Sequence, residues 1–143
     1  MNFILFLAKA SAVLTVLYGG MNVHQLTSSY AYLVDKSDEF RAAVTEEGGL
    51  PRLARLNIIF YVLLPFAYLS LLHYSSLPAL LIAVLAVKFM ITGSLDLWVE
   101  RRILTGQAYS LVQHYLSRAD NLFNIFSAVA VIRFLLTGTL NSH

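Results

Sequence analysis

The sequence predicts an all-α integral membrane protein, a four-helix transmembrane bundle with its helices in up-down-up-down order. Hydrophobic residues make up 58% of the 143 residues and charged residues only 13%, whereas soluble domains average about 45–50% and about 25%. The mean hydropathy is +0.69, and a membrane-spanning helix needs roughly 20 mostly apolar residues. We therefore expect one transmembrane domain over residues 1–143, with spans at about 2–26, 57–74, 78–99 and 120–138.

The first apolar run covers residues 2–26, and its helical character is expected to continue to Asp35. No positive charge precedes the run, as one does in a signal peptide, so we interpret it as a span. Ser11, Thr15 and Gly19 recur every four residues, which places them on one face of a helix. Small residues at this spacing let two helix backbones approach closely in lipid. This stripe predicts helix packing, either within the bundle or against a partner.

Residues 35–55 form an extended polar segment. Asp35-x-x-Asp38 is typical of a helix start, so we expect a short helix that ends at Gly48–Gly49 and rests on the lipid headgroups. Pro51 suits the first turn of the next helix, where a missing N–H costs nothing.

Lysine and arginine residues gather in two connecting segments: Lys36, Arg41, Arg52, Arg55, Arg101, Arg102 and Arg118. The positive-inside rule makes both segments cytoplasmic, so both chain ends are expected on the non-cytoplasmic side. The expected location is the bacterial inner membrane.

Two signals interrupt the later apolar runs. Pro65 lies inside the second span and should kink it, because proline has no N–H and its ring clashes with the preceding turn. Thr105-Gly106-Gln107 predicts a break, so the fourth helix is expected from about Ala108 to Leu136. Asn121 and Asn124 in that helix are expected to form interhelical hydrogen bonds.

Three positive side chains lie within the spans: Lys9, Lys88 and Arg133. The helical rise places Lys9 and Arg133 about 10 Å, and Lys88 about 15 Å, from the non-cytoplasmic ends of their helices. Asp96 and Glu100 fall near the opposite face, so this positive layer is expected to lack a counter-charge in the chain. A charged residue at the bilayer centre costs about 2.5–3.5 kcal/mol. Three interpretations stay open: snorkelling to headgroups, an acidic residue of a partner helix, or an anionic ligand such as a lipid headgroup.

A second polar layer is expected nearer the cytoplasm. The helical rise places His24, Glu100 and His114 at similar depths, with Asp96 about one turn deeper and Arg118 close to His114 in sequence. Two histidines and a carboxylate are the ligands of one class of iron site, and two histidines can bracket a haem. A proton or quinone site, or a layer of wetted interfacial side chains, are the other interpretations. No His-x-x-His or Glu-x-x-His motif occurs, so no metal ligand set is assigned.

Several function classes are excluded by composition and motifs. Cysteine is absent, which excludes disulfides and thiolate chemistry. Gly-x-Ser-x-Gly, phosphate-binding loops and His-Glu-x-x-His do not occur, so no catalytic residue is assigned and no enzyme activity is expected. The net charge of +2 forms no basic stripe, so no nucleic-acid partner is expected.

The leading interpretation is a non-catalytic accessory or assembly subunit of a larger membrane complex, or a homo-oligomer. It depends on the small-residue stripe and on the positive layer without counter-charge. A haem- or quinone-binding membrane anchor of a redox complex is the first alternative, and a small transporter or channel subunit is the second. The expected partners are membrane lipids and either another membrane protein or a second copy of the chain.

Overall fold

The computed structural model describes residues 3–46, 49–75 and 77–140, and within these ranges the chain is helical and contains no strand. Residue 2 of the first predicted span and residues 47–48 of the predicted polar segment lie outside the described residues. Four helices are long and apolar enough to cross a membrane: Leu5–Thr27, Gly49–Tyr74, Ala79–Leu104 and Leu111–Thr137. The fold is all-α, as predicted, and has the properties of an integral membrane protein.

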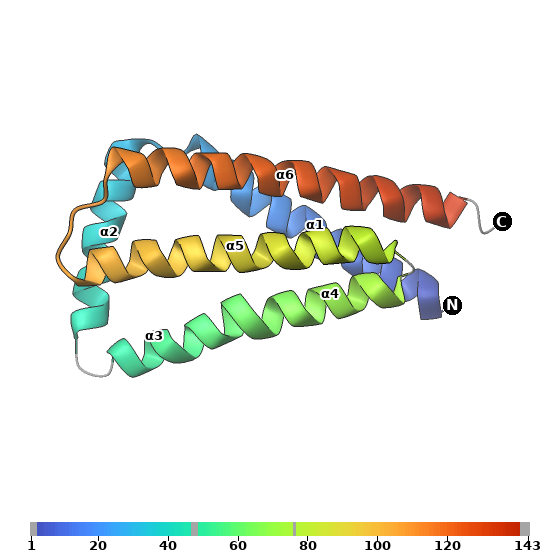
Figure 1. Cartoon of the computed structure of the whole chain (residues 1–143), viewed down its shortest axis with the longest axis horizontal. Helices are drawn as coiled ribbons and strands as arrows, with labels where there is room; N and C mark the ends of the chain where they lie inside the picture. The colour runs from blue at the N-terminus through green and yellow to red at the C-terminus, as the bar shows by residue number, and fades with distance from the viewer. Residues whose placement is uncertain (1–2, 47–48, 76, 141–143) are drawn as a thin grey trace.

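The first long helix, α1 (Phe3–Thr27), is followed at once by the polar helix α2 (Tyr30–Thr45). The Ser29 hydroxyl oxygen accepts a hydrogen bond from the Tyr32 N–H, which is the usual contact of a helix N-cap. The predicted helix start at Asp35 is therefore wrong, because Ser29 already caps the helix upstream. Figure 1 shows α2 lying across one end of the bundle.

The second long helix consists of three segments: α3 (Gly49–Ile58), η1 (Ile59–Leu63) and α4 (Leu64–Tyr74). η1 is one turn of π-helix, in which the Leu64 N–H donates to the Ile59 carbonyl. Pro65 follows directly, and its ring would crowd the carbonyl four residues earlier in a regular α-helix. The wider π-turn accommodates the proline within a continuous helix.

The last two helices, α5 (Ala79–Leu104) and α6 (Leu111–Leu140), are joined by a short irregular segment. Gly106 there has a φ of +82°, a conformation that glycine adopts without the cost of a Cβ clash. The break predicted at this place is confirmed. α6 begins with a reciprocal cap, in which the Ser110 N–H donates to Gln113 Oε1 and the Gln113 N–H donates to Ser110 Oγ, as in a capping box.

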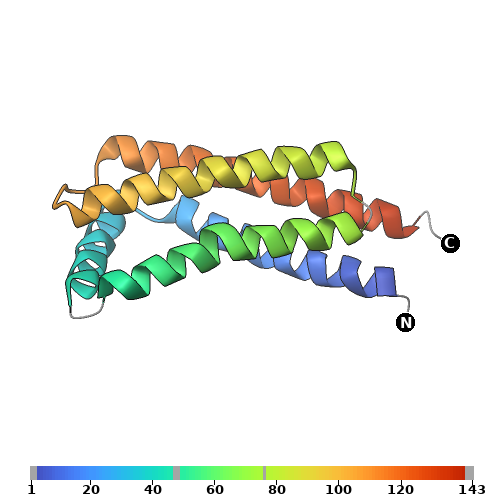
Figure 2. The ribbon, with the colours of Figure 1, turned by 60° about the horizontal axis from the view of Figure 1, so that its bottom comes forward.

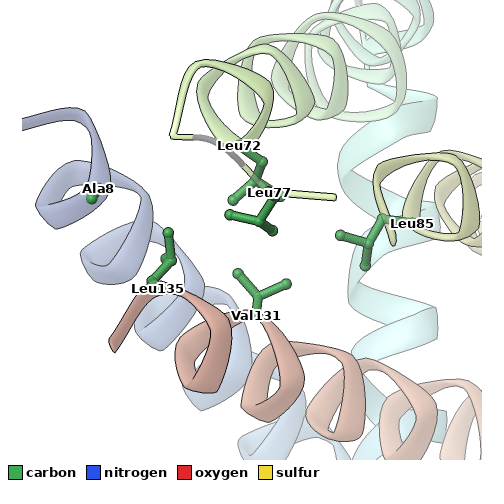
Figure 3. Close-up of a cluster of buried hydrophobic side chains, with 6 residues drawn as sticks. All are labelled: Ala8, Leu72, Leu77, Leu85, Val131 and Leu135. Atoms are coloured by element: carbon green, nitrogen blue, oxygen red, sulfur yellow. The ribbon is translucent and has the colours of Figure 1, made fainter. Parts of the chain in front are cut away.

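The two ends of the bundle differ. α1 starts and α6 finishes at one end, the terminal end, and α2 lies across the opposite end, the α2 end (Figures 1 and 2). A cluster of buried apolar side chains closes the terminal end (Figure 3): Ala8, Leu72, Leu77, Leu85, Val131 and Leu135. Toward the α2 end, α1 and the α3–η1–α4 helix diverge (Figure 2). α1 packs along α6 and meets the second long helix at α4, which leaves space between the helices.

Candidate functional site: a cavity between the spanning helices

A cavity of about 470 Å³ lies between α1, η1, α4, α5 and α6. This volume is within the range of about 300–1,000 Å³ found for small-molecule sites. Part of the cavity is lined by apolar side chains that are also exposed on the bundle surface, among them Leu17, Met21, Phe60 and Leu64. Such side chains face lipid in a spanning protein, so the cavity has a mouth between α1 and the η1–α4 helix.

The inner wall contains a hydrogen-bond network that joins three helices. The Thr92 hydroxyl of α5 donates to Asp120 Oδ1 of α6 over 2.8 Å. The Asn124 amide donates to Asp120 Oδ2 over 3.0 Å and to Asn22 Oδ1 of α1 over 2.6 Å. All four side chains line the cavity, so its polar wall is held in place by contacts between helices. The interhelical hydrogen bond predicted for Asn124 is confirmed, whereas the one predicted for Asn121 is not formed with any residue of the described ranges.

Lys88 lies inside the bundle and is only 4% exposed. Its ammonium donates to the Tyr18 hydroxyl over 2.6 Å. The Nζ atom also lies 5.1 Å from the centre of the Tyr18 ring and 4.9 Å from that of Phe89, within the range of cation–π attraction. The side chain therefore does not lie in open lipid, and α1 supplies its nearest polar partner.

Lys88 forms no salt bridge with a carboxylate of the described ranges, and its hydrogen-bond partner is the Tyr18 hydroxyl. A carboxylate nevertheless lies deeper in the bundle than expected. Asp120, which the predicted fourth span placed at the cytoplasmic edge, lies about 14 Å along α6. It accepts a hydrogen bond from Thr92, one turn from Lys88.

The carboxylates of α5 differ in their partners. Glu100 accepts hydrogen bonds from the Asn57 amide over 2.8 Å and from the Tyr61 hydroxyl over 3.1 Å, so it ties α5 to α3 and η1. Asp96 lines the cavity, and its side chain forms no hydrogen bond with any residue of the described ranges. Asn121, 3% exposed, also lines the cavity, and its side-chain amide is likewise unpartnered there.

The three cationic side chains of the predicted positive layer do not come together. Lys9 on α1 and Arg133 on α6 are exposed on the bundle surface, whereas Lys88 is internal. Lys9 and Arg133 thus lie where long side chains reach headgroups, and neither lines the cavity.

The two predicted histidines lie in different environments. His24 is exposed on α1, and so is Arg118 on α6. His114 is 6% exposed, with its ring centre 5.6 Å from that of Tyr30 and 5.8 Å from that of Tyr115. No three His, Asp or Glu side chains of the described part of the chain are arranged to hold a metal ion, so the structure does not form the His-His-carboxylate group considered above.

A small aromatic cluster surrounds His114 at the α2 end. The Tyr30 hydroxyl donates to the Tyr109 carbonyl over 2.7 Å, and burial raises the pKa of the Tyr109 phenol above its usual range. These contacts hold the start of α2 against the segment that precedes α6, which fixes the end of the bundle next to the cavity.

The small-residue stripe of α1 packs within the chain. Ser11 and Thr15 have no exposed surface, and the Thr15 and Tyr68 hydroxyls share a hydrogen bond of 2.6 Å. Gly19 faces α6, where an added Cβ would lie 3.4 Å from the Cβ of Ala128. The stripe lets α1 approach α4 and α6, so it offers no free surface for a partner helix.

The polar wall of the cavity has a signal in the sequence. Three of the helices that line it, α1, α5 and α6, carry a polar stripe at helical spacing. The stripes are Tyr18, Asn22 and Gln25 in α1, Thr92, Asp96 and Glu100 in α5, and Ser117, Asn121 and Asn124 in α6. Asp96 and Glu100 were singled out only for their depth, and Asn121 and Asn124 only as hydrogen-bonders; three such stripes on apolar helices indicate a shared polar interior.

Comparison of the chain with protein-family models, with curated proteins and with solved structures finds no match to any of them.

Proposed function

We propose that this protein is a small integral membrane protein that binds an amphipathic, lipid-soluble molecule in the cavity between its helices. One observation carries the proposal: the cavity joins an exposed apolar mouth to a polar inner wall. A molecule that dissolves in the bilayer reaches the mouth without crossing water. Its apolar part then contacts Leu17, Phe60 and Leu64, and its polar part reaches the side chains of α5 and α6.

This proposal differs from the leading interpretation of the sequence. Two of the features that favoured that interpretation make their contacts within the bundle. The small-residue stripe packs against α4 and α6, and Lys88 is partnered by Tyr18. An accessory subunit or a homo-oligomer is the second candidate, and exposed Lys9 and Arg133 favour it, since an acidic partner helix would compensate their charge. The native mass of the detergent-extracted protein tests it, because a mass equal to one chain argues against both assemblies.

Quinone binding and transport are two particular forms of the proposed function. A quinone is amphipathic and would fit the description of the ligand, and a transporter would release the bound molecule on the other side of the membrane. The ligand experiments below include a quinone probe.

The orientation in the membrane follows from the charges. The Lys and Arg residues of α2 and of the ends of α3 and α5 lie at the α2 end, opposite the start of α1 (Figure 1). We infer that the α2 end faces the cytoplasm of a bacterial cell and that both chain ends face outward. Alkaline phosphatase fused to the C-terminus should be active and green fluorescent protein fused there should be dark; the reverse pattern would overturn this orientation.

A matched pair of variants at the cavity mouth tests ligand binding. Leu17 and Val16 are neighbours with similar exposure, 60% and 58%, but only Leu17 lines the cavity. Leu17→Trp should obstruct the mouth, whereas Val16→Trp adds the same ring to the lipid-facing surface. Both positions are on the bundle surface, so both variants should fold.

The measurement is saturable binding of radiolabelled dodecylamine, dodecanol and decylubiquinone to the protein in lipid nanodiscs, with empty nanodiscs as the blank. We expect at least one probe to bind, with its affinity lowered at least about fivefold by Leu17→Trp and changed by less than about twofold by Val16→Trp. Absence of saturable binding for all three probes, or equal effects of the two variants, would overturn the proposal.

A further inference from the structure

The ionisable side chains at and behind the cavity wall differ in their hydrogen bonds, and one carboxylate has none. These side chains are Lys88, Asp96 and Glu100 of α5 and Asp120 of α6. Three of the four have hydrogen-bond partners in the chain. The fourth, Asp96, is the group for which a ligand is needed, and this inference rests on the proposed binding function.

Lys88 and Asp120 both have hydrogen-bond partners within the bundle. The Lys88 ammonium donates to the Tyr18 hydroxyl, and it forms no direct ion pair with a carboxylate of the described ranges. Asp120 also accepts hydrogen bonds from Thr92 and Asn124. Lys88 lines a shallow groove between α5 and α6 on the other face and not the cavity, while Asp120 borders both. Both oxygens of Asp120 therefore accept a hydrogen bond from the chain, and the Lys88 side chain does not line the cavity.

Glu100 is satisfied in a different way. Both of its carboxylate oxygens accept a hydrogen bond, one from Asn57 and one from Tyr61. Glu100 does not line the cavity. Hydrogen bonds to an ionised acceptor are among the stronger ones, so Glu100 is stabilised by its own bundle.

Asp96 has neither kind of partner. Its side chain lines the cavity, and within the described ranges it forms no hydrogen bond and no direct ion pair. A second unsatisfied group lines the same cavity: the Asn121 amide is 97% buried and forms no side-chain hydrogen bond in the same ranges. An unpartnered carboxylate and an unpartnered amide inside a membrane-spanning bundle are costly, and their presence in one cavity indicates a polar group that fills it.

We propose that the ligand carries an alkylammonium head, which donates hydrogen bonds to the Asp96 carboxylate and the Asn121 amide oxygen. An ammonium supplies both the positive charge and the N–H donors that these two acceptors lack. The aromatic rings of Phe60, Tyr61 and Tyr68 also line the cavity and attract a cation through their faces. The apolar tail of the ligand extends to the mouth between α1 and η1–α4.

Other amphipathic heads fit the wall less well. A carboxylate or phosphate head would face Asp96 and Asp120 and would be repelled. A quinone offers carbonyl acceptors, which cannot donate to a carboxylate. An alcohol donates one hydrogen bond but brings no charge, so it should bind more weakly than the amine with the same tail.

The experiment compares dodecylamine, dodecanol and laurate, three probes with one tail length and different heads, in nanodiscs of zwitterionic lipid at neutral pH. We expect dodecylamine to bind at least about tenfold more tightly than dodecanol, which corresponds to about 1.4 kcal/mol, and laurate not to bind. Asp96→Asn should abolish the preference for the amine and leave dodecanol affinity within about twofold. Glu46→Gln, which removes an exposed carboxylate after α2, is the control for net charge and should retain the preference.

The outcomes separate this inference from the proposed function. Equal affinity of the amine and the alcohol, or an amine preference that survives Asp96→Asn, would overturn the alkylammonium head while leaving a ligand cavity in place. If none of these probes binds, and if Leu17→Trp also leaves the binding of decylubiquinone unchanged, the proposed cavity function is overturned as well. Thermal denaturation of Asp96→Asn without probe verifies that the variant is folded.

Discussion

The terminal end of the bundle and the half that contains the cavity (the cavity half) are built from the same helices, but different contacts hold the helices together in each. At the terminal end Leu72, Leu85 and Val131 fill the space between helices and are at most 3% exposed. In the cavity half, hydrogen bonds between side chains hold the helices, and Asp96 and Asn121 stay without partners in the described ranges. The difference assigns the stable core to the terminal end and leaves the cavity half for the proposed binding site.

The divergence of the helices explains how one bundle holds both regions. α1 and the α3–η1–α4 helix are connected by α2, which lies across the end of the bundle and keeps their ends apart (Figure 2). At the terminal end only a short connection separates α4 from α5, so the helices close on one another. The bundle therefore opens gradually from the terminal end to the α2 end.

The largest effect is expected from a cavity made in the closed region. Leu72 has no exposed surface, whereas Leu80 on α5 is 79% exposed. Leu72→Ala should lower the free energy of unfolding by about 2–5 kcal/mol, because buried leucine truncations lose transfer energy and leave a void. Leu80→Ala should change it by less than about 0.5 kcal/mol. Unfolding in sodium dodecyl sulfate measures both, and equal losses would contradict the assignment of the stable core.

A smaller effect is expected within the polar wall, where the two aspartates should behave differently. Asp120→Asn replaces one of the two oxygens that accept from Thr92 and Asn124 with an NH2 donor, so it should cost about 1–3 kcal/mol of unfolding free energy. Asp96→Asn loses no hydrogen bond within the described ranges and should leave stability unchanged or raise it. The same unfolding titration compares them. A loss for Asp96→Asn as large as that for Asp120→Asn would show that Asp96 serves the fold and not a ligand.

The smallest effect is expected where the two regions meet. Tyr68→Phe removes the hydroxyl that pairs with Thr15, and interhelical hydrogen bonds of this kind in membrane proteins average about 0.6 kcal/mol. Tyr74→Phe removes a hydroxyl from a side chain that is 65% exposed and should have no measurable effect. Differential scanning calorimetry of both variants would locate the boundary between the two regions more closely. A much larger loss of unfolding free energy for Tyr68→Phe would mean that this contact belongs to the stable core.

Much of the fold was predictable because its determinants are local. The apolar runs predicted the spanning helices, and the glycine at 106 predicted the break before α6, since its positive φ favours glycine. The start of α2 was predicted wrongly because two candidate caps, Ser29 and Asp35, stand close together in the sequence. Only the contact of Ser29 with the Tyr32 N–H distinguishes them.

The site was less predictable because depth along a helix does not give rotation about it. Asp96 and Lys88 were both singled out from the sequence, but the hydrogen-bond partner of Lys88 lies on α1 and Asp96 has none within the described ranges. Lys88 meets Tyr18 across 70 residues of sequence, and Asn124 meets Asn22 across 102. No local sequence pattern predicts such pairs, because they form only when the polar faces of three helices are oriented toward the same interior.

The sequence by itself determined that this chain is a helical membrane protein, since length and hydropathy fix which segments can exist in lipid. It also determined which ionisable residues lie within the spans. Tertiary structure alone decided which of these residues has a partner. A polar group buried in a bundle is satisfied by whatever side chain the neighbouring helix presents at that depth and angle: α1 presents Tyr18 to Lys88, whereas Asp96 lines the cavity without a hydrogen bond in the described ranges.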